Sequence, residues 1–369
     1  MGRLVALDLP GGPAFVDALR RAWGRGDAVL PLDQRLPAAS RRELCSRLGA
    51  AAVIDGSAAM TELAGGMPIA DGDALVVATS GSSGTPKGVV LTHAAVTASA
   101  LATSRRISVT DDDHWLACLP MSHVGGLSVV TRALATGTRL TVLPGFEVHA
   151  VESSGATLVS LVATALGRID PSLFRVIVLG GSRPPPDRPA NTVTTYGMTE
   201  TGSGIVYDRR PLDGVELRVV AGEIQVRCPM LLRCYRDGAD PRTADGWFPT
   251  GDLGELDPDG LLTVHGRRGD LIITGGENVW PEPVEAVLAG HPRIRDVAVV
   301  GRPDDEWGQV VTALVVPAAG DPPTLAELRA LVKEQLPAYC APHRLELCDH
   351  LPRTSLGKLR RADLASGTH

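Results

Sequence analysis

The sequence predicts an α/β protein with a large N-terminal part and a small C-terminal α+β part. In the first half of the 369 residues, short apolar runs alternate with amphipathic segments, which favours parallel sheets covered by helices. From about residue 215 the runs become shorter and are separated by turn signals, which is typical of a small antiparallel subdomain. The length also exceeds that of one usual compact core, so we expect two or more domains.

The large part is expected to begin with helices and to continue as alternating strands and helices. Apolar side chains recur at helical spacing in residues 13–24, and a second short helix is predicted at 42–48. Further helices are expected at about 93–104 and 125–136. The predicted strands are 75–78, 115–118, 139–143, 157–161 and 176–179. The antiparallel subdomain is expected to contain strands 216–220, 223–226 and 261–265.

The C-terminal part is predicted to begin after the sequence Gly-Arg-Arg-Gly-Asp at 266–270. Its expected elements are helix 282–289, strands 296–301 and 309–317, and helix 324–336. Thr324 and Glu327 form a capping box for the last helix, which is expected to bury its leucines. These leucines are Leu325, Leu328, Leu331 and Leu336. The predicted division is an N-terminal domain at 1–267, a hinge at 268–270 and a C-terminal domain at 271–369.

Composition excludes several classes of protein. Lys and Arg total 36 against 42 for Asp and Glu, so nothing indicates a nucleic-acid or anionic-membrane partner. No apolar stretch approaches the ~20 residues of a membrane helix, and the N-terminus lacks a signal-peptide core. The six cysteines form no C-x-x-C pair and are expected to be free thiols in a reducing cytoplasm. The oligomeric state is left open.

The strongest chemical signal follows the strand at 75–78. Glycines allow close backbone approach, hydroxyl and N–H groups donate to phosphate oxygens, and a lysine adds positive charge. The spacing differs from that of the P-loop, because Pro86 stands where the P-loop needs glycine. The alternative is a flexible Gly/Ser loop without a ligand. The segment consists of Thr79, Ser80, Gly81, Ser82, Ser83, Gly84, Thr85, Pro86 and Lys87, followed by Gly88.

This segment and four later ones, in the same order, resemble the motifs of the adenylate-forming superfamily. That group includes acyl-CoA synthetases, adenylation domains of peptide synthetases and luciferases. The later segments are 196–200, 250–252, 266–267 and 352–361, and the resemblance extends from about residue 28 to 364. It implies ATP, Mg²⁺ and CoA as cofactors, a small carboxylic acid as substrate, and a mobile C-terminal domain. Residues 26–33 resemble a segment normally well inside the chain, which implies a shortened N-terminal domain.

The resemblance assigns the first nucleotide contacts to the sequence Tyr-Gly-Met-Thr-Glu at 196–200. It implies that Tyr196 lies on adenine, with Gly197 and Met198 beside it, and that Thr199 contacts phosphate. Glu200 is implied to bind Mg²⁺, which favours carboxylate oxygens together with substrate phosphates. A strand-to-turn corner is the alternative for this motif.

Three other positions complete the implied nucleotide site. Asp252 matches an aspartate that accepts hydrogen bonds from both ribose hydroxyls, and an acceptor-only carboxylate suits a cis-diol. Arg267 matches an arginine that contacts ribose and phosphate. Gly180, Gly181 and Ser182 resemble a loop that lines the adenine and acyl pockets in the family. An ordinary turn is the alternative for these residues.

The remaining implied site residues concern catalysis and CoA. Lys358, in the P-x-T-x-x-G-K-x-x-R segment, matches the lysine that reaches the active site during adenylation. Gly275 and Gly276 resemble a turn that faces the pantetheine arm, and Trp307 stands where acyl-CoA synthetases carry a tryptophan near CoA. His123 resembles a histidine that gates the acyl pocket. The alternative for Trp307 is a half-buried surface aromatic, and the alternative for His123 is a structural histidine.

We therefore expect a ligase in which a carboxylate attacks the α-phosphate of ATP and CoA then displaces AMP from the acyl-adenylate. The compact chain resembles most the o-succinylbenzoate–CoA ligases of menaquinone synthesis. An enzyme for another aryl or fatty acid, one that loads a carrier protein in trans, and a non-catalytic nucleotide-binding protein are the alternatives. Gly269 stands where the family usually has a polar hinge residue, so side-chain locking of the hinge is in doubt.

Overall fold

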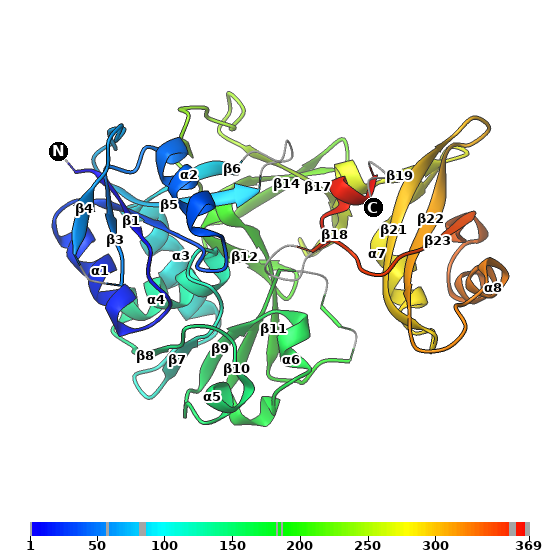
Figure 1. Ribbon diagram of the computed structural model, residues 1–369, viewed down its shortest axis with the longest axis horizontal. Coiled ribbons are helices and arrows are strands. Elements are labelled where there is room, and N and C mark those ends of the chain that lie inside the picture. Colours follow the sequence, from blue (N-terminus) through cyan, green and yellow to red (C-terminus); the bar gives the residue numbers. More distant parts are fainter. Residues whose placement is uncertain are drawn as a thin grey trace. The chain divides into compact units, whose positions relative to one another are not determined.

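The computed structural model (Figure 1) describes residues 2–56, 59–80, 86–181, 184–185, 187–353 and 359–365. The chain forms two compact units. The first contains residues 1–218, 225–249 and 257–262, and the second contains 219–224, 250–256 and 263–369.

The first unit contains two sheets. The strand order of one is β16-β6-β5-β2-β1-β3-β4, in which β1, β2, β3 and β5 run parallel, whereas β6 is antiparallel to β5. All four residues of β1 and of β2 are fully buried or nearly so, as expected for strands covered on both faces. The bounds are β1 Leu4–Leu7, β2 Ala28–Pro31, β3 Ala52–Ile54, β4 Met60–Glu62, β5 Asp73–Ser80, β6 Pro86–Thr92 and β16 Cys234–Tyr235.

The other sheet has the order β13-β12-β11-β10-β9-β7-β8, and its strands from β11 to β8 are parallel. Strand β12 is antiparallel to β11, so the expectation of largely parallel sheets is confirmed with antiparallel additions at the edges. The bounds are β7 His114–Ala117, β8 Arg139–Val142, β9 Leu158–Leu161, β10 Val176–Leu179, β11 Thr192–Met198, β12 Ser203–Tyr207 and β13 Arg210–Pro211.

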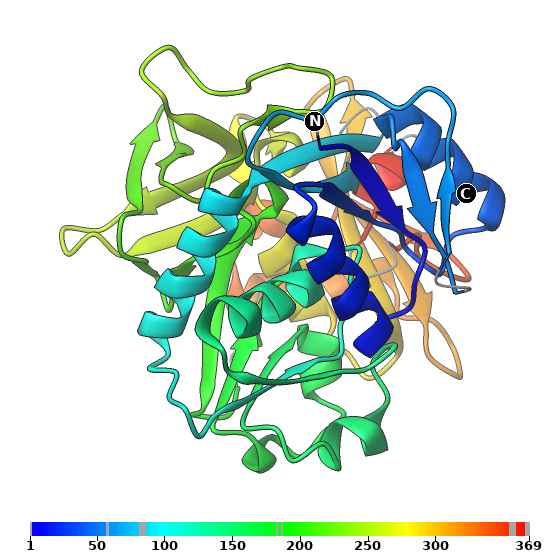
Figure 2. The same cartoon turned by 90° about the vertical axis from the view of Figure 1, so that its left-hand side faces the viewer.

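Helices α3 and α4 pack against each other; α3 contacts strands of both sheets, and α4 packs on the second (Figure 2). The buried face of α3 carries alanine, serine and threonine, whose small side chains allow this close packing. The hydroxyl of Thr92 caps α3 by accepting from the N–H of Ala95, and Gly137 ends α4 at a φ of 72°. The helices are α1 Pro13–Gly24, α2 Ala38–Leu48, α3 His93–Arg106, α4 Val124–Thr136, α5 Val148–Glu152 and α6 Ala163–Leu166.

The predicted antiparallel subdomain forms a separate sheet of order β14-β15-β17-β18. The division between the two compact units runs through this sheet and does not fall at residues 268–270. The hinge at 268–270 therefore stays a prediction. The bounds are β14 Glu216–Val220, β15 Glu223–Arg227, β17 Phe248–Leu256 and β18 Leu262–Arg267, and a 3₁₀ turn follows at Arg268–Asp270.

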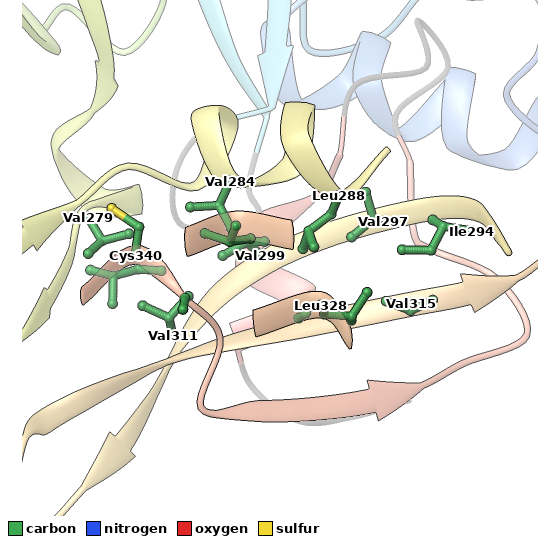
Figure 3. Packing of buried hydrophobic residues seen from close by; sticks show 14 residues of the cluster. Val279, Val284, Leu288, Ile294, Val297, Val299, Val311, Val315, Leu328 and Cys340 are labelled. Carbon is green, nitrogen blue, oxygen red and sulfur yellow. The ribbon is translucent and has the colours of Figure 1, made fainter. Parts of the chain in front are cut away.

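The C-terminal sheet has the order β20-β19-β22-β21, and β23 pairs in parallel with β22. Helices α7 and α8 cover one face of it around a core of valines and leucines, which includes Val284, Val299 and Leu328 (Figure 3). The bounds are β19 Ile272–Thr274, β20 Glu277–Val279, α7 Pro281–Leu288, β21 Ile294–Asp304, β22 Gly308–Pro317, α8 Leu325–Gln335, β23 Arg344–Leu347 and α9 Arg361–Ala365.

The capping box of α8 is confirmed: Thr324 Oγ1 accepts from the N–H of Glu327, and the Glu327 carboxylate accepts from the N–H of Thr324. The expected burial of four leucines was partly wrong, because α8 buries Leu328 and Val332. Leu336 is partly buried against the same core, and Leu325 and Leu331 are also only partly buried. Helix α8 lies at the surface, and its buried face is too narrow to include all four leucines.

All six cysteines lie in described parts of the chain and are free thiols, as expected. Cys45, Cys118, Cys234 and Cys340 are buried, and Cys228 and Cys348 are partly buried. Across the described ranges, no helix is long and apolar enough to cross a membrane.

Candidate functional site

The phosphate-binding segment lies at a strand connection in the first unit. Thr79 and Ser80 end β5, and Lys87 lies in β6 directly opposite Thr79. The strand predicted at 75–78 continues to Ser80 and a further strand begins at Pro86, because the antiparallel β5–β6 ladder extends into the motif at both of its ends. This register places the lysine and the threonine on neighbouring strands. Residues 81–85 lie outside the described residues.

The motif at 196–200 spans the end of β11 and a 3₁₀ turn at Thr199–Thr201. The β11–β12 pairing shifts register at Gly197, where a Cβ would lie 2.3 Å from the carbonyl oxygen of Ser203. Only glycine fits there. The hydroxyl of fully buried Thr201 accepts from the N–H of Met198 at 3.1 Å, which fixes the turn that carries Thr199 and Glu200.

Tyr235 connects Glu200 with Lys87, a role that the sequence did not reveal. Its hydroxyl donates to Oε1 of Glu200 at 2.9 Å, and the Lys87 ammonium lies 4.9 Å from the centre of its ring. Tyr235 lies on β16, which pairs with β6, and the adjoining Leu232 N–H donates to the Glu200 carbonyl at 2.7 Å. Nothing local to residue 235 indicates this pairing, because its partners lie far away in the sequence.

A second group of implied nucleotide residues lies together in the second unit. The carboxylate of Asp252, 9% exposed, pairs with Nε of Arg267 at 2.8 Å. Arg267 also donates to the carbonyl of Thr250 at 3.0 Å, and the Thr250 hydroxyl accepts from the N–H of Asp252. Between them, Gly251 has a φ of 73°, a conformation that favours glycine. Strands β17 and β18 thus present a carboxylate and a guanidinium side by side, as a ribose 5′-phosphate would require.

The glycine turn and Trp307 meet in the C-terminal sheet. The N–H of Gly275 donates to the carbonyl of Trp307 at 3.0 Å, and a Cβ on Gly275 would lie 2.6 Å from the indole ring. Gly276, by contrast, faces open space. The indole is 43% exposed and lies 5.8 Å, centre to centre, from the ring of His343. The structure therefore brings together the residues that the sequence assigned to CoA.

His123 lies at the N-terminal end of α4, with Nε2 3.7 Å from a carboxylate oxygen of Asp33. Burial lowers the pKa of His123 below its ordinary value, and the nearby Asp33 carboxylate only partly opposes this effect. The imidazole is thus held mainly neutral. Gly180 and Gly181 follow β10, where a Cβ on Gly180 would lie 2.7 Å from the hydroxyl of Thr195. Ser182 and Lys358 lie outside the described residues.

Arg132 was missed by the sequence analysis, although it is 2% exposed. Its guanidinium donates to the hydroxyls of Ser160, Ser203 and Tyr207, and no ion pair in the described part of the chain includes it. The guanidinium also lies 5.4 Å from the centre of the Trp115 ring. A buried cation is normally matched by a buried anion, so hydroxyl and aromatic partners without an anion are unusual. The sequence does contain a feature that could have identified Arg132. It is the one charged residue in the helix predicted at 125–136, whose other residues are apolar or small.

Among the site residues described above, Glu200 has the side chain that suits a divalent cation. Within the described ranges, no group of three or more His, Cys, Asp or Glu residues could hold a metal ion alone. Glu200 offers carboxylate oxygens on a partly exposed turn, which fits Mg²⁺ that arrives already bound to substrate phosphates.

Comparisons with known proteins identify related families and structures. Residues 68–235 match the AMP-binding enzyme family, and residues 283–358 match the AMP-binding enzyme C-terminal domain. A probable 2-succinylbenzoate–CoA ligase of Mycobacterium tuberculosis is 41% identical over 97% of both chains. A 2-succinylbenzoate–CoA ligase of Bacillus cytotoxicus is 37% identical over 78% of this chain and 69% of the relative.

Among solved structures, o-succinylbenzoate CoA synthetase from Bacillus subtilis in complex with the acyl-adenylate intermediate OSB-AMP is similar, with a TM-score of 0.87 and 29% identity. The match covers 98% of this chain and 88% of that chain. The same synthetase in complex with ATP and magnesium ion gives a TM-score of 0.86 at 30% identity, with coverage of 98% and 89%.

Proposed function

Because the chain belongs to the AMP-binding enzyme family, we propose that it is an ATP-dependent 2-succinylbenzoate–CoA ligase of menaquinone biosynthesis. An acid carboxylate oxygen would attack the α-phosphorus of ATP, and the bond to the bridging oxygen of pyrophosphate would break. The CoA sulfur would then attack the acyl carbon of the adenylate, and AMP would leave. The relatives named above and the paired residues of the site support this proposal.

The chain's own residues would supply positioning and charge for the first step. Lys87 and the residues around it would contact phosphate oxygens, and Thr199 would donate to a phosphate oxygen. Glu200, oriented by Tyr235, would hold Mg²⁺, which neutralises phosphate charge when bound. Asp252 and Arg267 would recognise the ribose and its phosphate. Lys358 is proposed to stabilise charge at the α-phosphate during adenylation.

For the second step, Gly275, Gly276 and Trp307 are proposed to contact CoA. The exposed indole lies next to the backbone of Gly275, beside the C-terminal sheet. The mobile C-terminal domain and the hinge at 268–270 remain part of the proposal. The cytoplasmic location is also proposed, and the free cysteines are consistent with a reducing compartment.

The observation in this chain that favours 2-succinylbenzoate over a monocarboxylic acid is Arg132. 2-Succinylbenzoate has two carboxylates, so one remains charged when the other is adenylated. One of the hydroxyls that accept from Arg132 is that of Ser203, and it lies 3.4 Å from the hydroxyl of Ser128. Ser128 lines a narrow internal cavity with Val124, which follows His123, and with Gly202, which follows the turn that carries Thr199. We propose that Arg132 neutralises the second carboxylate of the acid, with Ser203 and Ser128 lying between the guanidinium and this cavity.

The test compares acids with and without the second carboxylate. Acid-dependent AMP formation with CoA should be far faster with 2-succinylbenzoate than with 3-benzoylpropionate, benzoate or a medium-chain fatty acid. Arg132→Gln should remove most of this preference while the slow reaction of 3-benzoylpropionate persists. Equal turnover of a fatty acid would contradict the proposed substrate. Release of AMP only when an acyl carrier protein replaces CoA would favour the carrier-loading alternative.

A further inference from the structure

Arg361 is the most extensively paired cation in the C-terminal part of the chain that the structure describes. Its side chain is 14% exposed and forms two hydrogen bonds to the carboxylate of Glu285, at 2.6 and 2.7 Å. Its Nε lies 3.3 Å from Oδ2 of Asp270, and Nη2 lies 3.5 Å from Oε1 of Glu282. The same guanidinium donates to the carbonyl of Val299 at 3.0 Å. Three carboxylates therefore depend on one cation.

These partners belong to three different parts of the C-terminal unit. Glu282 and Glu285 lie on α7, and Val299 lies on β21, whose N–H donates to Glu285 at 2.7 Å. Asp270 ends the 3₁₀ turn at the predicted hinge. Arg361 itself begins α9. One side chain thus connects the hinge segment, the body of the domain and the segment that follows Lys358.

The residues on either side of 354–358 are also fixed to the domain. Arg353 and Leu359 form an isolated antiparallel bridge, and the N–H of Arg360 donates to the carbonyl of Pro352 at 2.9 Å. Arg353 pairs with Asp296 on β21, with its Nη2 2.6 Å from Oδ1. Leu359 packs against a cluster that includes Val300 and Leu364. Both ends of the stretch that contains Lys358 are therefore attached to the face of β21 and β22 opposite α7 and α8.

We propose that Arg361 is a positioning residue for adenylation, which holds Lys358 at a fixed place relative to the hinge residue Asp270. Three residues of chain span at most about 11 Å, so a fixed Arg361 limits how far the Lys358 backbone can lie from it. Because Arg361 also holds Asp270, Lys358 would be placed by the orientation of the whole domain and not by independent motion of the tail. This inference rests on the proposed role of Lys358.

Electrostatics explains why a change at Arg361 should reach the hinge. Burial raises the pKa of Glu282, and the Arg361 guanidinium is what opposes that rise most. Without the guanidinium, three partly buried carboxylates would face one another, and Asp270 is the one that belongs to the 3₁₀ turn at the predicted hinge. Loss of Arg361 should therefore release the hinge residue as well as the start of α9.

The experiment separates the two half-reactions in Arg361→Gln, Asp270→Asn and the double variant. Acid-dependent pyrophosphate exchange measures adenylation, and CoA capture of pre-made acyl-adenylate measures the second step. In Arg361→Gln we expect kcat for adenylation to fall about 10²-fold, as when one preorganised donor is lost, with CoA capture and the KM for ATP little changed. Asp270→Asn, which keeps the pair with Glu285, should lower adenylation less, and the double variant should be no worse than Arg361→Gln.

Two controls make the outcome decisive. Arg293→Gln breaks the ion pair with Glu327 at the start of α8, in the same domain, and should leave both half-reactions unchanged. Lys358→Ala tests the premise: if adenylation survives it, the proposed role of Lys358 fails. If Lys358→Ala abolishes adenylation but Asp270→Asn and Arg361→Gln do not reduce it, the positioning role is wrong. An equal fall in both half-reactions of Arg361→Gln, with Asp270→Asn unaffected, would indicate a structural role only.

Discussion

The hydroxyl of Tyr235 lies 2.9 Å from Oε1 of Glu200, and the Lys87 ammonium lies 4.9 Å from the centre of the same ring. One aromatic side chain thereby orients a carboxylate from the 3₁₀ turn at Thr199–Thr201 and a cation from β6. A phosphate group that carries Mg²⁺ needs both charges at a short separation, since the cation contacts phosphate oxygens and the carboxylate contacts the metal ion.

Replacement of Tyr235 by Phe should weaken the response to Mg²⁺. The ring and its contact with Lys87 remain, but Glu200 loses a donor to a charged oxygen, which costs about 1.5–3 kcal/mol at most. The Mg²⁺ concentration for half-maximal pyrophosphate exchange should rise by up to about 10- to 100-fold, with the KM for the acid unchanged. Tyr339→Phe, at an exposed tyrosine, is the matched control. An unchanged Mg²⁺ requirement would show that Tyr235 does not orient Glu200.

Asp252→Asn should weaken ATP binding. The substitution keeps the size of the side chain, but it removes the charge that pairs with Arg267 and the second acceptor for a diol. Loss of a charged hydrogen-bonding partner should cost about 1.5–3 kcal/mol in the binding free energy, which calorimetry can measure directly. Glu216→Gln breaks an exposed ion pair with Arg227 and serves as the control. If Asp252→Asn binds ATP as the natural protein does, the ribose assignment is wrong.

Gly275→Ala and Gly276→Ala form a matched pair that tests the CoA surface. Both positions have positive φ, 57° and 86°, so both substitutions carry similar backbone strain of roughly 1–2 kcal/mol. Only the methyl group at 275 would overlap the Trp307 ring and displace it. CoA capture of the acyl-adenylate should therefore slow much more in Gly275→Ala than in Gly276→Ala, with adenylation similar in both. Equal effects in rapid-mixing measurements would exclude Trp307 from CoA binding.

His123 should contribute to the pH dependence of stability. Burial lowers its pKa below the ordinary 6.5, so below that pH the unfolded chain binds the proton more readily than the folded chain does. The stabilisation is complete above the ordinary pKa and is lost as the pH falls through the folded-state pKa. Urea unfolding near pH 8 and near pH 5 should therefore show a smaller loss of stability in His123→Gln than in the natural protein. A larger loss in the variant would reverse the assigned sign.

Sequence reasoning located most of the regular elements, because their apolar periodicity is local. The strand at 75–78, the helices at 93–104 and 125–136 and the long C-terminal strands all correspond to observed elements. It missed β1 and β2, which are short, wholly buried runs that carry no alternation. It also missed β6, because the phosphate-binding motif directed attention to its glycines and not to the valines that follow.

The site was predicted only as far as motifs could specify it. Asp252 and Arg267 are fifteen positions apart in the sequence, yet they form an ion pair. Gly275 and Trp307 are also distant in the sequence, and they are in contact. Tyr235, Arg132 and the partners of Arg361 could not be predicted, because each acts through residues that only tertiary packing brings near. A buried arginine among hydroxyls has no periodic signature, and a carboxylate triad around one guanidinium has no fixed spacing.

The free cysteines acquire a meaning from the chemistry proposed for the protein. An acyl-adenylate reacts with any thiolate that reaches it, including one from the enzyme itself. Burial raises the pKa of all six thiols, to about 11 for Cys45 and Cys228 and about 12 for Cys118. At neutral pH they remain protonated and poorly nucleophilic. In the proposed reaction, burial of the cysteines would therefore disfavour acylation of the enzyme's own thiols.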